Sequence, residues 1–239
     1  MAPAPSSAQT VYFVRLVALQ SPAAVVRHLR ADERELRTAT GARFVSLARD
    51  RQLLIRQVAG DARLVAAVER IAPGERDDLA ARRDLAALSA ESPPQVGGVS
   101  TGPALPADTL LSFYRAAGRR FGIRWQLLAA INFVESDFGR ARTTAKADAQ
   151  GPMQFEPATW RRYGLGGDVY DPHDAIFAAA NLLAADGGRT NERAALMHYN
   201  LSPLYRDAVL HLAHRIAHVP TAFREYYAWR LYLRGAGAR

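Results

Sequence analysis

Apolar residues recur at steps of three and four, or their multiples, along most of this chain of 239 residues. One series is Leu36, Phe44, Leu47, Leu54 and Val58, and a second is Leu110, Phe113, Tyr114, Ala117 and Phe121. This spacing places apolar side chains on one face of a helix. No alternation of apolar and polar residues is long enough to predict a strand, and no internal repeat is present. The sequence therefore predicts an all-α fold.

Changes in composition divide the chain. The run Ser92–Pro103 is rich in proline and glycine, which is typical of a linker or a surface strap. In the helical region before it, no polar residues gather in a pattern that would predict a catalytic site. Asp32 followed by Glu35 predicts a capping pair at a helix start in this region. The predicted segments are 1–10 (flexible N-terminus), 11–91 (helical arm), 92–106 (linker), 107–218 (compact domain) and 219–239 (aromatic-rich C-terminal segment, expected to dock back on the rest of the protein).

The chain is basic, with 31 Lys+Arg against 23 Asp+Glu and a net charge of +8. This charge is spread over both halves, and it suits a polyanion such as nucleic acid, anionic lipid or an acidic cell-wall polymer. Because no motif combines aromatic and basic residues for reading bases, a nucleic-acid partner is disfavoured.

Cysteine is absent, which excludes disulfides, iron–sulfur clusters and a thiol nucleophile. The apolar run Val11–Leu19 contains an arginine and is shorter than the ~20 residues that span a bilayer. We therefore expect no transmembrane segment. If the protein is exported, we expect its signal peptide to have been trimmed from this chain.

Glu135 stands out in the segment Trp125–Ser136, which is apolar nearly all round and is therefore predicted to be a buried helix. Desolvation and the negative end of the helix dipole both disfavour an ionised carboxyl group at this C-terminal end. A carboxylic acid that stays protonated near neutral pH can act as a general acid in cleavage of a glycosidic bond. From this helix alone, a cap or an ion pair with Arg140 or Arg142 remains the alternative.

Two further segments carry side chains suited to a sugar. Residues 149–160 (AQGPMQFEPATW) combine a glycine, two prolines, amides and aromatic rings, so they can present Gln154 and ring faces to a ligand or form a loop with buried aromatics. Tyr199 and Asn200 place a phenol beside an amide at a predicted helix end, where asparagine is also a common cap.

Four motifs in order resemble the soluble lytic transglycosylases, which cut the glycan strands of peptidoglycan and belong to the lysozyme-like superfamily. The motifs are Glu135-Ser136; Gly151–Phe155 with Pro157, Thr159 and Trp160; Tyr170–Ile176 leading into Ala178–Leu183; and Tyr199-Asn200 with Tyr205 and Val209. They cover roughly residues 108–218. The arginine-rich arm is similar in general character to that of actinobacterial-type members of the family.

The resemblance implies an all-α, lysozyme-like (goose-type/SLT) domain with an N-terminal helical extension. It also implies that Glu135 is the sole catalytic acid and base, and that no cofactor is needed. Asp171 and Asp174 are expected to cap the helix that follows them. The residues expected to bind substrate are Ser136, Gly151, Met153, Gln154, Phe155, Tyr199 and Asn200.

The implied reaction cleaves the β-1,4 bond between N-acetylmuramic acid and N-acetylglucosamine and leaves a 1,6-anhydromuramyl end. No second carboxylate is required, in contrast to the usual pair of glycosidase acids. Asp137, Asp148 or Glu156 could instead hold a water and give a lysozyme-like muramidase. Among these, Asp148 is the candidate second carboxylate, whereas Asp137 is expected to face solvent or to cap. A catalytically silent peptidoglycan-binding or scaffold protein is the other alternative.

Location and partners follow from the same resemblance. The protein is expected outside the cytoplasm, in the cell wall or secreted, with its arm contacting a partner in cell-wall synthesis or division. His211, His214 and His218 share one face of a predicted helix, as metal ligands can. A basic, partly exposed face is the favoured interpretation, and no metal is expected.

Overall fold

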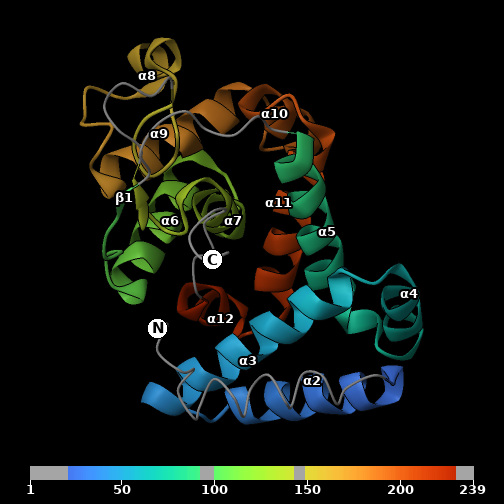
Figure 1. The fold of residues 1–239 in the computed structure, drawn as a ribbon. Coiled ribbons are helices and arrows are strands. Elements are labelled where there is room, and N and C mark those ends of the chain that lie inside the picture. Colours follow the sequence, from blue (N-terminus) through green and yellow to red (C-terminus); the bar gives the residue numbers. More distant parts are fainter. Residues whose placement is uncertain (1–20, 92–99, 143–148, 230–239) are drawn as a thin grey trace, which may run out of the picture. The chain divides into compact units, whose positions relative to one another are not determined.

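The computed structural model describes residues 21–91, 100–142 and 149–229. These residues form eleven α-helices, a short 3₁₀ helix and one two-stranded sheet (Figure 1), which confirms the predicted all-α class. The chain divides into two compact units, residues 1–83 and 84–239. Among the described helices, none combines the length and the apolar character needed to cross a membrane. The predicted flexible terminus 1–10 and the run Val11–Leu19 lie outside the described residues.

The first unit is a helical bundle with its own core. Its elements are α2 (Pro22–Leu36), α3 (Gly41–Ala59), α4 (Ala62–Ile71), η1 (Pro73–Glu75) and the start of α5 (Arg76–Glu91). Helices α2, α3 and α4 pack against one another (Figure 1). The buried residues of this core are Val25, Val26, Leu29, Leu54, Ile55, Val58, Val65, Val68, Ala72 and Leu79. The arm predicted from apolar spacing is therefore helical over its described part.

The start of α2 is capped by Ser21, whose hydroxyl oxygen accepts the backbone N–H of Ala24 at 3.2 Å. The predicted capping pair Asp32–Glu35 is wrong, because both residues lie inside α2, near its C-terminal end. Proline at the first helical position and serine before it are the stronger start signal.

Charged groups do gather inside this unit. Arg51 of α3 forms ion pairs with Glu75 and with Asp78, the latter at 2.9 Å, and all three side chains are at most 4% exposed. A buried arginine between two carboxylates balances charge that would be costly to bury alone. The cluster is thus a structural feature of the arm, which the sequence did not predict.

The second unit is built around one helix. Its elements are α6 (Ala107–Phe121), α7 (Trp125–Ser136), α8 (Pro157–Tyr163), α9 (Pro172–Ala185), α10 (Glu192–Tyr199), α11 (Pro203–His218) and α12 (Ala222–Ala228). Helix α7 packs against α6, α9, α11 and α12 (Figure 1). Residues 127–131 are fully buried. The prediction that the apolar segment forms a buried helix is confirmed.

The described end of the predicted linker is fastened to this unit. Strand β1 (Ser100–Thr101) pairs antiparallel with β2 (Ala141–Arg142), and the N–H of Gly102 donates to the carbonyl of Arg140 at 2.9 Å. The run was expected to be a linker or a surface strap, and residues 100–106 form such a strap. Residues 92–99 lie outside the described residues. The predicted boundaries at 91, 107 and 218 stay predictions.

The C-terminal segment docks back as expected over its described part. Helix α12 packs against α7 and α11, and Phe223 and Tyr226 are buried there. Residues 230–239, with Leu231 and Tyr232, lie outside the described residues.

Candidate active site

Glu135 lies in the last turn of α7, where its side chain is only partly accessible to solvent. Removal from water raises the pKa of this carboxyl group to about 7, and the neighbouring Tyr205 acts in the opposite direction. Desolvation dominates because the ionised form loses hydration that the protein does not replace. At neutral pH the group is poised between its acid and its base form.

Two tyrosines surround this carboxyl group. Tyr205 of α11 is buried, and burial followed by the charge of Glu135 raises the pKa of both Tyr205 and Tyr199 well above the usual value. The two rings stack with centroids 6.4 Å apart and 5° between their planes. Within the described residues, the Tyr205 hydroxyl has no partner in regular hydrogen-bond geometry. The hydroxyl is therefore available to Glu135, whose charge contributes to the raised pKa of Tyr205.

Tyr199 reaches the loop 149–155. Its hydroxyl donates to the carbonyl oxygen of Met153 at 2.7 Å, so it connects α10 to the loop beside Glu135. The sequence singled out Tyr199 as a partner of the catalytic group. Tyr205 appeared only as part of a motif, although its position six residues after Tyr199 was the available signal.

Ser136, expected to bind sugar, is buried and fully engaged by the protein. Its hydroxyl donates to the carbonyl of Pro152 at 2.6 Å and accepts the N–H of Gly139 at 2.9 Å. Asn132, one turn earlier, also donates to Pro152 at 2.8 Å and accepts from Tyr114 at 2.5 Å. These bonds fix the loop 149–155 to α7. A direct contact of Ser136 with substrate stays a prediction.

Gly151 is required by the shape of this loop. Its φ of +72° is in the left-handed region, and a Cβ atom there would lie 1.9 Å from the carbonyl oxygen of Val169. Gln154 also has a positive φ, of 51°, and its side-chain amide donates to the carbonyl of Gly151 at 2.7 Å. Only glycine combines a favourable positive φ with the absence of a Cβ atom, and position 151 requires both. The loop is therefore held in one sharp conformation.

Of the other residues expected at the site, Met153 and Phe155 belong to the loop and Asn200 lies at the end of α10. Met153 and Phe155 are buried, and the Phe155 ring packs edge-on against Trp160 with centroids 5.3 Å apart. Asn200 ends α10, and its side-chain oxygen accepts the N–H of Ser202 at 3.0 Å. The structure brings Met153 and Phe155 together as support for the loop, and their contact with substrate stays a prediction.

The three extra carboxylates differ in location. Asp137 was expected to face solvent or to cap a helix; it is the C-cap residue of α7, as the second alternative predicted. Its side chain is buried and does not face solvent, and burial raises its pKa to about 6. Glu156 is exposed at the start of α8. Asp148, the candidate second carboxylate, lies outside the described residues.

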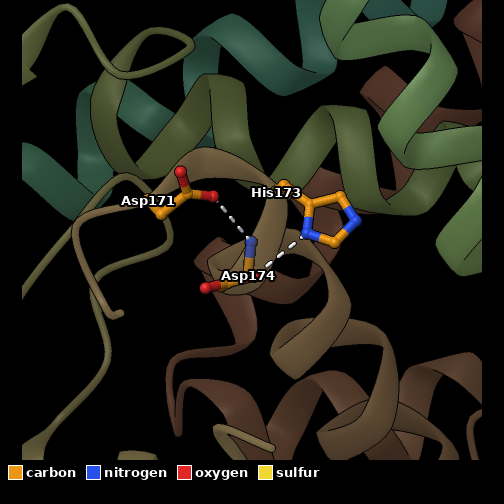
Figure 2. A group of neighbouring side chains, drawn as sticks. All are labelled: Asp171, His173 and Asp174. Atoms are coloured by element: carbon orange, nitrogen blue, oxygen red, sulfur yellow. Dashed lines mark hydrogen bonds and ion pairs between the residues drawn. The ribbon is translucent and has the colours of Figure 1, made fainter. Parts of the chain in front are cut away.

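Asp171 caps α9 as the sequence predicted, whereas the Asp174 side chain, also expected to cap, holds the segment before the helix. Figure 2 shows the Asp171 carboxylate accepting the N–H of Asp174, at 3.1 Å, while the Asp174 carboxylate faces the His173 ring at 3.0 Å. Asp174 also accepts the N–H of Asp168 at 3.0 Å. Although these side chains could offer three metal ligands, an Asp171 oxygen caps α9 and the Asp174 oxygens bond to His173 and to the N–H of Asp168.

The histidines of α11 lie on a helix as predicted. The rings of His214 and His218 are 4.1 Å apart, and His218 bonds to the backbone carbonyl of His214 at 2.8 Å. A separate hollow of about 420 Å³ lies at the opposite end of α7 from Glu135, with Trp125 and three arginines in its lining. One of these arginines, Arg124, is already paired with Glu192.

The domain is all-α, as lysozyme-like SLT domains are, and Glu135 lies at the end of its central buried helix. Residues 112–207, about two fifths of the chain, match the family model described as "Transglycosylase SLT domain". This region is a transglycosylase SLT domain, so the resemblance drawn from the motifs is confirmed. No curated protein and no solved structure matches the chain.

The SLT domain connects the chain to peptidoglycan. The domain supports a peptidoglycan-directed function of the lytic transglycosylase type in general, and SLT domain proteins act on peptidoglycan outside the cytoplasm. The matched region contains Glu135, the loop 149–155, Tyr199 and Tyr205, and it ends before α12.

Proposed function

We propose that the protein is a peptidoglycan lytic transglycosylase in which Glu135 is the single general acid and base. The observation that carries this proposal is the pKa of about 7 of a carboxyl group at the end of a buried helix. A group that is half protonated near neutral pH can give a proton in one step and take one in the next. In this reaction the same residue must first give a proton and then take one.

In the first step, Glu135 protonates the oxygen that links C1 of N-acetylmuramic acid to N-acetylglucosamine, and the C1–O bond breaks. The acetamido oxygen of the muramic residue stabilises the positive charge that develops at C1. In the second step, the Glu135 carboxylate takes the proton of the C6 hydroxyl, and O6 bonds to C1. Because the nucleophile belongs to the substrate, no water is consumed and no second carboxylate is needed.

The remaining expectations form part of the same proposal. Ser136, Gly151, Met153, Gln154, Phe155, Tyr199 and Asn200 shape or line the site around Glu135. The protein acts in the cell wall or as a secreted enzyme, and the helical arm contacts a partner of cell-wall synthesis or division. The net charge of +8 favours binding to an anionic wall.

Product analysis tests this function. Purified peptidoglycan is digested with the protein, and the soluble fragments are weighed by mass spectrometry. We expect 1,6-anhydromuramyl ends, which are lighter by one water than hydrolytic products. Reducing muramyl ends would identify a muramidase instead, and binding without soluble fragments would identify a silent binding protein.

Tyr205→Phe tests the partner of Glu135. Because the hydroxyl lowers the pKa of Glu135, its removal is expected to raise that pKa. The general acid then stays protonated to higher pH, so the alkaline limb of the rate profile moves up by about 0.7 pH units, given ~1 kcal/mol for a hydrogen bond. The measurement is kcat/KM between pH 5 and 9, with Tyr163→Phe on α8 as the control. An unmoved limb would contradict this role of Tyr205.

A further inference from the structure

The backbone directly after Glu135 and Ser136 adopts an unusual conformation. Asp137, Phe138 and Gly139 have successive φ angles of 50°, 61° and 83°. The left-handed region is unfavourable for residues with a Cβ atom, and here two of them adopt it in a row. Such conformations persist only where the surrounding structure determines them, and they gather at functional sites. The turn 137–139 therefore depends on what holds it.

Part of this support comes from α7 itself. The N–H of Asp137 donates to the carbonyl of Phe133 at 2.9 Å, and the N–H of Phe138 donates to that of Asn132 at 3.2 Å. The N–H of Gly139 donates to the Ser136 hydroxyl. These bonds tie the turn to the same helical turns that carry Glu135. A shift of the turn would therefore displace the end of α7.

The second support comes from α12 and the residues around it. The Phe138 ring contacts Phe133, Phe223 and Tyr227, with centroids 5.4, 5.8 and 5.7 Å away. Arg140 donates to the carbonyl of Tyr227 at 2.9 Å, and its guanidinium lies 4.4 Å from the centre of the Tyr227 ring. Rings from α12 thus enclose the one aromatic side chain of the strained turn.

Arg140 also contacts the turn directly. It reaches the carbonyl oxygen of Asp137 at 3.3 Å and one carboxylate oxygen at 3.4 Å. The other carboxylate oxygen of Asp137 is buried and has no hydrogen-bond partner among the described residues. A buried oxygen without a partner is unfavourable, so Asp137 does not stabilise this conformation unaided. Arg140 is the group that connects it to α12.

Helix α12 is itself firmly anchored. Glu225 and Arg215 of α11 form a buried ion pair at 2.9 Å. The Tyr226 ring stacks on Phe133 of α7, with centroids 5.4 Å apart and 14° between their planes. The Tyr227 hydroxyl donates to the carbonyl of Leu105 at 2.8 Å. The aromatic cluster is therefore fixed to α7, to α11 and to the strap at residues 100–106.

We propose that α12, which follows the matched SLT region, is a positioning element of the catalytic site, and that Arg140 and Tyr227 are positioning residues. They hold the turn 137–139 in its strained form and thereby keep the end of α7, with Glu135, in place. This inference rests on the proposed function of Glu135. It assigns to the C-terminal aromatic segment a part in the reaction.

Arg140→Ala and Tyr227→Leu are the test, with Arg124→Ala as the matched control. Arg124 stands at the other end of α7 and is paired with Glu192 at the surface. We expect kcat to fall by ~10- to 100-fold in both test variants with little change in KM, because small misplacements of a catalytic group have effects of this size. The control keeps its kcat, and Arg140→Lys recovers part of the activity.

A direct titration separates this proposal from the function on which it rests. The Glu135 carboxyl is followed by NMR with ¹³C-labelled glutamate in the full chain, with Glu135→Gln to assign the signal. The pKa is expected to fall by more than half a unit in Arg140→Ala and to stay unchanged in Arg124→Ala, whether or not peptidoglycan is cleaved. If both test variants melt earlier but keep the wild-type kcat and the wild-type titration, α12 is a stabilising element only and the proposal is wrong.

Discussion

Glu135→Gln is expected to abolish peptidoglycan cleavage and, at the same time, to stabilise the protein at alkaline pH. Glutamine keeps the shape of the side chain but can neither give nor take the proton. Loss of general acid–base catalysis alone corresponds to ~10²–10⁴-fold in rate, and both steps of the proposed reaction depend on this residue. The measurement is the release of soluble fragments from purified peptidoglycan. Activity equal to that of the wild type would remove Glu135 from its role.

The gain in stability follows from the pKa. The carboxyl group has a pKa of about 7 in the folded protein, against 4.5 for a glutamate in water, so folding favours the protonated form. Below about pH 4 both states are protonated and the wild type carries no penalty. As pH rises from 4.5 to 7 the wild type loses stability, and above pH 7 the loss is complete. A shift of this size corresponds to about 3 kcal/mol.

Thermal and urea unfolding at pH 5 and at pH 8 test this dependence. Glu135→Gln should gain much more over the wild type at pH 8 than at pH 5, because glutamine does not titrate. Glu156→Gln, an exposed glutamate of the same domain, serves as the control and is expected to show the same small difference at both values. Equal gains for Glu135→Gln at the two pH values would show that the group is not desolvated.

Arg51→Ala is expected to destabilise the helical arm by about 3–5 kcal/mol, the range found when one partner of a buried ion pair is removed. The substitution would leave the carboxylates of Glu75 and Asp78 buried without their counter-ion. Because the chain has two compact units, hydrogen exchange of the amides of α3 is the appropriate measurement, since it reports this unit separately.

The control for Arg51 lies on the same helix. Arg43 pairs with Glu35 at 2.6 Å, and both side chains are about half exposed. Surface pairs contribute at most about 1 kcal/mol because water screens them. Arg43→Ala should therefore change the exchange rates little. A similar effect of the two substitutions would mean that the Arg51 cluster does not stabilise the arm.

Local interactions explain what could be predicted from sequence. The buried helix Trp125–Ser136 and the cap formed by Asp171 depend on neighbours within a few positions along the chain, and both predictions are confirmed. The order of four motifs was sufficient to recognise the SLT domain. Asp32 and Glu35 show how such reasoning fails, since a capping pattern inside a longer helix has no free N–H groups to satisfy.

Predictions about which side a residue faces were less successful. Asp137 follows a helix end, where solvent is the usual surrounding, yet the turn after α7 folds under Arg140 and Tyr227 and buries it. Ser136 and Met153, whose contact with substrate stays a prediction, are buried in bonds and packing that hold the loop. Exposure depends on segments that arrive from far along the chain.

The sequence by itself determined the helical class, the burial of α7 and the presence of a carboxyl group at its end, because helical periodicity and desolvation are properties of one segment. The tertiary structure decided how that group is tuned. Tyr205 comes from α11, the loop from residues 149–155 and the aromatic support from α12, and each meets Glu135 or its turn only through packing of distant segments. A pKa depends on all the atoms around a group, so it is fixed only when the chain has folded.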